Sequence, residues 1–317
     1  MDGCPHNNKL GARDGDMYRN LILFGAGASF GSDTFSTPPL GCQLFSELAR
    51  FNPPGWGNVP DELIEIFEED FERGMAKVPE FNAHWMPVLQ RAMAAYFFNF
   101  VPSTSNLYYQ LATRISGASW DGACATLNYE RLLELSLRGA AVRPVVGCEP
   151  NDSSQVELIL PHGCCHIFCD AVQGNARGVS FSGVGITTNG RVSVVANPAQ
   201  FQARINSDAF PPVMSYFEPG KRTNTGASFI AGQRQRWNEL ARSATAIAIV
   251  GVGVRSEDSH IWQPVSESEA TIIYCSGGDG AALYRDWAEQ EGKLSSSLIL
   301  EGFFADEFDN ICGRLEL

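Results

Sequence analysis

Four segments of the chain place glycines or polar side chains directly after short apolar runs. The apolar run at 21–24 leads into the glycine-rich segment 25–31, and later runs lead into polar residues at 126–128, 160–163 and 249–258. Short continuous apolar runs that end at glycine or polar residues are typical of buried parallel strands. Because ligands bind at the carboxyl ends of such strands, the four segments predict one shared crevice.

The first segment is suited to a phosphate group. Gly25, Gly27 and Gly31 spell GxGxxxG, whereas the dinucleotide fingerprint is GxGxxG. Small residues let the backbone approach a pyrophosphate, whose oxygens accept hydrogen bonds from backbone N–H groups. A purely structural glycine turn is the alternative.

The same residues admit a hydrolase interpretation. Gly27 to Gly31 also spells G-x-S-x-G around Ser29, the nucleophile-elbow pattern, with Asp258 and His260 as the further triad members. In that fold several strands precede the elbow, and only one strand fits before Ser29. The expected topology therefore opposes this interpretation.

The other three segments carry the candidate catalytic and ribose-contacting residues. Asn128 ends a strand and is suited either to binding a ligand or to capping the next helix. His162 follows another strand and can serve as a base near neutral pH, although a lone histidine is more often a structural hydrogen-bonding residue. Gly251 opens a turn that either contacts a ribose or adenine, or only connects a strand to a helix.

Strands alternating with helices predict a Rossmann-like doubly wound parallel α/β sheet. We expect a flexible tail at 1–18 and one domain at 19–317, with a helical insertion at about 52–118. The glycine-, serine- and threonine-rich segment 170–228 is either a small β-rich lobe or long loops. The strands of the sheet are expected at 21–24, 122–127, 142–146, 156–160, 244–250, 270–275 and 297–300.

Composition excludes several classes of protein. The chain has 23 basic and 36 acidic residues, a formal net charge of −13, and no cluster of basic residues that would bind nucleic acid directly. It has no run of eighteen apolar residues and no secretory signal, so we expect no membrane span and a cytoplasmic location. The cysteines around Cys164 have no second pair, so we expect no metal.

Taken together, the four segments resemble the Sir2 family. Residues 25–29 resemble its GAG[AI]S loop, and 126–130 resemble its T-x-N-x-[DE] segment. Residues 160–163 resemble its L-H-G motif, with Pro161 replacing the more usual residue before the histidine, and 249–258 resemble its late I-x-G segment. Two departures are clear: Ser36-Thr37-Pro38-Pro39 stands where deacetylases have I-P-D-F-R, and their four-cysteine zinc ribbon is absent.

The resemblance implies an NAD⁺-cleaving core of the kind found in bacterial anti-phage Sir2-like NADases. NAD would be the substrate, cleaved to nicotinamide and ADP-ribose. The implied catalytic residues are Asn128, which orients water or ribose hydroxyls, and His162, the general base. The implied NAD contacts are Gly25, Ala26, Gly27, Ser29, Thr126, Gly251 and, on the adenosine side, Asp258.

The resemblance also implies an activity that a partner protein controls, and we expect a homo-oligomer. Two alternatives stay open: a non-catalytic sensor subunit that binds NAD or ADP-ribose, and an NAD-dependent protein deacylase. If the chain is an NADase, Asn128→Ala and His162→Ala should each abolish nicotinamide release while leaving the fold intact.

Overall fold

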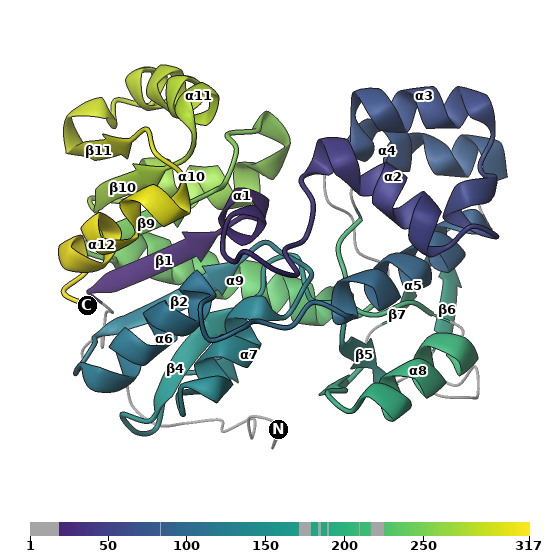
Figure 1. Cartoon of the computed structure of the whole chain (residues 1–317), viewed down its shortest axis with the longest axis horizontal. Coiled ribbons are helices and arrows are strands. Elements are labelled where there is room, and N and C mark those ends of the chain that lie inside the picture. Colours follow the sequence, from purple (N-terminus) through teal and green to yellow (C-terminus); the bar gives the residue numbers. More distant parts are fainter. Residues whose placement is uncertain are drawn as a thin grey trace.

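The centre of the molecule is a seven-stranded, wholly parallel sheet (Figure 1). The computed structural model describes residues 19–82, 84–170, 179–182, 185–188, 190–208, 210–216 and 225–317. The strands lie in the order β11-β10-β9-β1-β2-β4-β3. The chain starts at β1 in the middle, builds one half of the sheet, and then returns to β1 to build the other half. The β1/β9 border is therefore the topological switch point, where α/β sheets bind ligands.

The strands of the sheet match the apolar runs of the sequence. They are β1 Asn20–Phe24, β2 Gly122–Thr126, β3 Arg143–Val146, β4 Gln155–Ile159, β9 Ala246–Val250, β10 Thr271–Cys275 and β11 Ser297–Leu300. Two small antiparallel pairs join β5 Ile167–Cys169 to β8 Val192–Val194 and β6 Val179–Ser182 to β7 Gly185–Thr188. The predicted doubly wound parallel fold is confirmed.

Helices cover both faces of the sheet, which explains why its inner strands β1, β9 and β10 are almost wholly apolar. Ile22 and Phe24 of β1 pack into one core with α6, α7 and α12, while Leu21 and Leu23 pack into the other with α9, α10 and α11. The helices are α6 Leu107–Gly117, α7 Leu132–Gly139, α9 Ala227–Ser243, α10 Ser259–Glu267, α11 Gly278–Gln290 and α12 Phe304–Arg314. Short helices are α1 Ala26–Phe30, η3 Ser256–Asp258 and η4 Leu294–Ser296.

A group of helices lies between β1 and β2 in the chain and beyond the carboxyl end of β1 in space (Figure 1). It contains α2 Gly41–Phe51, η1 Trp56–Asn58, α3 Asp61–Glu69, α4 Phe71–Asn82 and α5 Trp85–Phe98. Its core is aromatic: the ring of Phe67 lies 5.0 Å from that of Phe45 and 5.4 Å from that of Trp56. The expected bounds of the insertion, about 52–118, remain a prediction. We call α2–α5 the helical segment.

The helical segment contains a break between α3 and α4. Residues 61–77 form parts of α3 and α4, which separate at Asp70. Asp70 has an extended backbone and its carboxylate accepts a hydrogen bond from the N–H of Arg73, so it caps α4. Glu69, Asp70 and Glu72 lie at this break.

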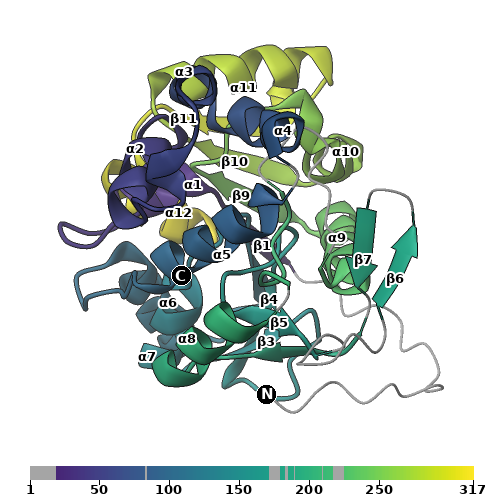
Figure 2. The same ribbon diagram turned by 90° about the vertical axis from the view of Figure 1, so that its right-hand side faces the viewer.

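Two further expectations concern the segments at the start and middle of the chain. The expected tail at 1–18 lies outside the described residues, as does part of 170–228. The described part of 170–228 contains β6, β7, β8 and the helix α8 Pro198–Ser207. In Figure 2 the β6–β7 pair lies beside α9, and α8 lies apart from that pair, on the other side of the view. Within the described residues, no helix combines the length and apolarity needed to cross a membrane.

Candidate active site

Two glycine turns contact each other at the switch point: the first at residues 25–27, after β1, and the second at Gly251, after β9. The N–H of Gly25 donates to Val250 O (2.9 Å) and the N–H of Gly27 donates to Gly251 O (3.0 Å). A Cβ on Gly25 would lie 2.5 Å from Gly251 O, and a Cβ on Gly251 would lie 2.1 Å from the nitrogen of Ala28. The lack of a side chain at these glycines therefore lets the two turns approach each other closely. A pyrophosphate bound here would need donors other than the Gly25 and Gly27 amides.

Ser29, in α1 directly after the first glycine turn, connects α1 to α6 and to the loop between β2 and α7. Its hydroxyl donates to Glu130 Oε1 at 2.6 Å and accepts from Asn128 Nδ2 at 2.8 Å. Tyr108 OH lies 2.9 Å away and acts as a second donor, since the single hydroxyl proton of Ser29 goes to Glu130. Burial raises the pKa of Glu130, while the hydrogen bond from Ser29 opposes that shift. Three partners occupy the Ser29 hydroxyl, which opposes its use as a hydrolase nucleophile.

Asn128 ties the β2 end to the first glycine turn. Its amide donates to Gly25 O (3.0 Å) as well as to Ser29 Oγ, and its own N–H donates to Thr126 Oγ1 (3.1 Å). Both amide protons of the side chain are thereby committed, which leaves its oxygen Oδ1 as the atom with capacity for a ligand. Thr126 positions Asn128 and is not among the described residues that line the cavity.

The loop that carries His162 is held by α9 and by residues 213–215. Gln233 Oε1 accepts from the N–H of Leu160 (2.9 Å), and Arg234 Nε donates to Pro161 O (3.2 Å). The N–H of Ser215 donates to His162 O (2.8 Å). Gly163 has φ +79°, and a Cβ there would meet Val213 O at 2.0 Å, so the glycine after the histidine is a steric requirement.

His162 has two polar neighbours from the segment after β9. Its Nε2 lies 2.9 Å from Nε2 of His260 and 3.8 Å from Oδ1 of Asp258. His162 and Asp258 are both buried, and His260 is half-buried. Asp258 therefore lies beside the candidate base, and this placement gives no support to the expected contact with the adenosine side of NAD.

A cavity of about 710 Å³ lies between the carboxyl ends of the strands and the helical segment. Its lining includes Gly25, Ala26, Gly27, Ser29, Asn128, His162, Gly251 and Asp258, all predicted from the sequence. Carboxylates of Glu69, Asp70, Glu72 and Asp279 also line it. Among the described lining residues Arg255 is the only Arg or Lys, and it pairs with Glu72 at 3.3 Å. The cavity is thus mainly acidic, with one cation.

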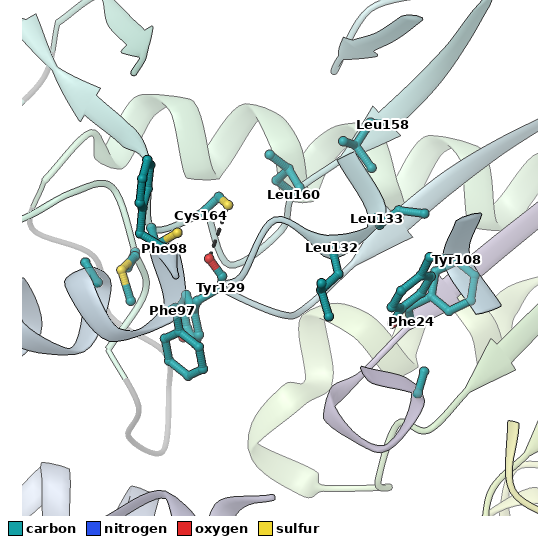
Figure 3. Packing of buried hydrophobic residues seen from close by; sticks show 14 of the residues in the cluster. Phe24, Phe97, Phe98, Tyr108, Tyr129, Leu132, Leu133, Leu158, Leu160 and Cys164 are labelled. Atoms are coloured by element: carbon teal, nitrogen blue, oxygen red, sulfur yellow. Dashed lines mark hydrogen bonds between the residues drawn. The ribbon is translucent and has the colours of Figure 1, made fainter. Parts of the chain in front are cut away.

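Tyr129 connects this cavity to the core beneath it. Its ring lies 6.1 Å from that of Phe97 of the helical segment and 6.5 Å from that of His162. Figure 3 shows the Cys164 thiol directed at Tyr129, whose carbonyl oxygen accepts a hydrogen bond from Sγ at 3.2 Å. Burial raises the pKa of the Tyr129 phenol well above its ordinary value, so the group stays neutral and donates to Ser215 O.

A buried charged pair stabilises the loop behind His162. His166 Nε2 lies 2.8 Å from Glu134 Oε2, and its Nδ1 lies 3.2 Å from Cys164 Sγ. Burial alone would lower the pKa of His166, but Cys164 and Glu134 raise it to about 10. Burial alone would raise the pKa of Glu134, but His166 and Arg138 lower it to about 2.

These shifts predict how the pair contributes to stability as pH changes. The His166 contribution is complete below its ordinary pKa of 6.5 and declines toward pH 10, whereas that of Glu134 is complete above 4.5 and declines toward pH 2. The native chain should have a larger free energy of unfolding in urea than His166→Gln, and this difference should decrease as the pH rises above about 6.5. A difference that stays constant to about pH 9 would contradict the assigned charge states.

In the part of the chain that the structure describes, two groups of side chains have donor atoms close enough for a metal ion: His162, Asp258 and His260, and Cys164, Cys165 and His166. Within each group the donor atoms all lie within 4.8 Å of one another. Hydrogen bonds and ion pairs already account for the short distances in both groups. The first group lies at the cavity wall, and the second is wholly buried.

Several residues of this arrangement were not predicted in these roles, and His260 was named only as a triad member in the hydrolase interpretation. Glu130 and Tyr108 complete the Ser29 network, Arg255 supplies the cavity's cation, and His260 contacts the candidate base. His260 had one signal in the sequence: it follows Asp258 by two residues, just after a strand and its glycine turn. Tyr108 had none, because its partner lies 79 residues away.

Comparison with known proteins gave matches among solved structures alone. No family model and no curated protein matches the chain. A Sir2 homologue in complex with ADP-ribose is 13% identical, with a TM-score of 0.44, over 94% of this chain and 92% of the other. A Sir2 homologue in complex with NAD is 16% identical, with a TM-score of 0.43, over 94% and 90%.

A third match is a Sir2 structure with an inhibitor, 2'-O-acetyl-ADP-ribose and a deacetylated peptide. It is 13% identical, with a TM-score of 0.38, over 86% of this chain and 94% of the other. We base the function below on the cavity and on the side chains that line it.

Proposed function

We propose that the chain is an NAD⁺ glycohydrolase, which converts NAD⁺ and water to ADP-ribose, nicotinamide and one proton. The observation that carries this proposal is that Asn128 and His162, on different strand ends, line the same cavity as the two glycine turns. That cavity lies at the switch point of the sheet, where nucleotides are generally bound. Its volume of about 710 Å³ is within the range of small-molecule and cofactor sites.

The charge of the cavity is suited to breaking the nicotinamide–ribose bond. The transition state of glycosidic cleavage resembles an oxocarbenium ion, so positive charge develops on the ribose. The carboxylates that line the cavity would stabilise that charge, and fixed groups cost no reorganisation during the reaction. Arg255, together with backbone N–H groups, would balance the pyrophosphate.

Two side chains have the chemistry required for the attacking water. His162 would take a proton from it, and the oxygen of the Asn128 amide would orient the water or a ribose hydroxyl. Tyr129, stacked near His162, would help exclude bulk water from the reacting atoms. Ser29 and Thr126 would act through Asn128, since their hydroxyls are bonded to it.

We base the proposed biological role on the sequence resemblance. The enzyme would be a defence effector against phage, form homo-oligomers and be switched on by a partner protein. The ion pair between Arg255 and Glu72 is consistent with a controlled activity, since it engages the cavity's cation from within the chain.

The direct test is to incubate the protein with NAD⁺, alone and with the products of neighbouring genes, and to follow nicotinamide by chromatography. We expect release of nicotinamide and ADP-ribose in equal amounts. Binding of ADP-ribose without turnover in any mixture would instead support the sensor alternative, and formation of an O-acyl-ADP-ribose from an acyl-lysine peptide would support the deacylase.

Asn128→Ala tests the positioning of the substrate. We expect nicotinamide release to fall by about 100-fold, because a small displacement of a reacting group has effects of that size. The structure also predicts a loss of about 1–3 kcal/mol of stability for the two hydrogen bonds removed, although Gly25 O keeps the N–H of Ala28 as a donor and Ser29 Oγ keeps Tyr108 OH. The exposed Asn99, which donates to Ala95 O, provides the matched control Asn99→Ala. Equal effects of the two changes on activity would contradict the role of Asn128.

A further inference from the structure

Asn128 and Glu130 contact the same hydroxyl group from one loop. Both residues follow β2, and Ser29 Oγ lies 2.8 Å from Asn128 Nδ2 and 2.6 Å from Glu130 Oε1. Tyr108 OH is the third neighbour of that hydroxyl, at 2.9 Å. All four side chains are more than nine-tenths buried. Because buried polar groups are paired inside the protein, the protons of this group must be shared among its own members.

Two groups that can only accept determine where these protons lie. Gly25 O is 3.0 Å from the side-chain amide of Asn128, and a carbonyl oxygen only accepts, so the amide presents its nitrogen there. The second proton of that nitrogen then goes to Ser29 Oγ. An ionised Glu130 also only accepts, so Ser29 donates its single proton to Oε1. Each proton between Gly25 and Glu130 thus has one direction.

The carboxylate of Glu130 makes Ser29 available as an acceptor for Asn128. With its own proton held by Glu130, the Ser29 hydroxyl accepts from Asn128 and from Tyr108. If the Ser29 proton pointed at Asn128 instead, the amide would have to turn its oxygen toward Ser29. That oxygen would then also face Gly25 O, and two acceptors would oppose each other. The carboxylate therefore opposes rotation of the amide.

We propose that Glu130 is a positioning residue for the reaction, and that it acts through Ser29 to hold the Asn128 amide with Oδ1 available to the attacking water or a ribose hydroxyl. This inference rests on the proposed function, in which Asn128 orients one of those groups. Glu130 takes no proton from the substrate in this scheme. Its role is to hold one proton, that of Ser29, away from Asn128.

The surroundings of Glu130 stabilise the charge that this role requires. Burial raises its pKa, while hydrogen bonds from Ser29 and from the N–H of Leu132 oppose that shift. The charge of Arg131 opposes it as well. Both carboxylate oxygens thus accept a hydrogen bond, one from α1 and one from the start of α7. The charge is held by fixed neighbours on two elements.

Glu130→Gln removes the acceptor while keeping the shape of the side chain. The glutamine oxygen is needed by the N–H of Leu132, so the new amide nitrogen faces Ser29 as a donor. The Ser29 proton must then go to Tyr108, which leaves the phenol proton without its present acceptor, or to a rotated Asn128. We expect nicotinamide release to fall by about 10- to 100-fold, since Asn128 is no longer held in one orientation.

A double-mutant cycle tests whether this loss passes through Asn128. If it does, Glu130→Gln should have its large effect in the native chain and only a small one in Asn128→Ala. Glu69→Gln is the matched control, because Glu69 also lines the cavity but pairs with Arg73. It measures the loss of one negative charge alone. In Asn128→Ala, we expect Glu130→Gln to slow release no more than Glu69→Gln does.

Two results of the cycle would overturn the proposal. Equal factors for Glu130→Gln in the native chain and in Asn128→Ala would show that Glu130 acts without Asn128, for example on the substrate itself. An effect of Glu130→Gln in the native chain no larger than that of Glu69→Gln would show that the carboxylate contributes its charge and no positioning.

The orientation of the amide is measurable without any activity. In protein labelled with ¹⁵N at asparagine, the Asn128 side chain is the pair of signals that Asn128→Ala removes. Both of its protons have acceptors inside the protein, so we expect slow exchange with solvent in the native chain and in Glu69→Gln, and faster exchange in Glu130→Gln. Unchanged exchange in Glu130→Gln would overturn the proposal. If the native chain never releases nicotinamide, the proposed function fails, while these spectra still decide whether Glu130 holds the amide.

Discussion

Replacing His162 by alanine is expected to slow nicotinamide release by about 10²- to 10⁴-fold, the usual contribution of a general base. The physical reason is that His162 is the only histidine among the described residues that line the cavity, and its removal leaves the attacking water without a proton acceptor. We expect the affinity for ADP-ribose to change little, since the charge of Arg255 and the glycine turns is untouched. Rates under single-turnover conditions and calorimetric binding of ADP-ribose would measure both effects.

The matched control for this change is His84→Ala, which removes an exposed imidazole near the helical segment. The backbone contacts of the 162 loop, to Arg234 and Ser215, do not depend on the side chain and should preserve the fold. A His162→Ala protein that keeps its full rate would show that the base lies elsewhere, and with it the assignment of the reaction to this cavity would fail.

Gly251→Ala is expected to destabilise the protein strongly. Its φ of +63° is unfavourable for alanine by about 1–2 kcal/mol. In addition, the new Cβ would lie 2.1 Å from a backbone nitrogen, that of Ala28, which cannot move without displacing the first glycine turn. We expect a total loss of about 3 kcal/mol or more, or failure to fold, measured by urea denaturation.

Two other glycines separate the causes of this loss. Gly292 has a similar φ of +68° with no atom within 4 Å of a Cβ, so Gly292→Ala measures the backbone strain alone. Gly253 is on the same turn as Gly251 and also has open space, so Gly253→Ala should be nearly neutral. If Gly251→Ala costs no more than Gly292→Ala, the two turns are not locked together as the structure indicates.

The sheet was predictable because a strand that is buried on both faces has apolar residues at consecutive positions of the sequence. Runs such as Leu21–Phe24 and Ala246–Val250 are apolar at consecutive positions, which is unusual for half-exposed strands. The order of the strands has no such record: β3 lies at the edge, outside β4, although it precedes β4 in the chain. The helix α9 was missed because Ile230, Trp237 and Leu240 are separated by polar residues in a segment rich in Gln and Arg.

The candidate site was predictable to the level of which strand ends converge. Polar residues at the carboxyl ends of parallel strands share an edge by necessity, so Asn128 and His162 could be placed in one cavity from topology alone. Their partners could not be predicted, because they depend on packing between distant segments. The glycines illustrate the difference: the predicted close approach is real, but its partner is a second turn more than 220 residues along the chain.

The pairing of Arg255 with Glu72 couples the helical segment to whatever enters the cavity. An anionic ligand that reaches Arg255 competes with the Glu72 carboxylate at the start of α4 for the same cation. By thermodynamic reciprocity, any molecule that draws α4 away strengthens anion binding by the factor with which the anion loosens α4. A molecule that binds the outer surface of these helices could therefore change the affinity of the cavity for its ligand.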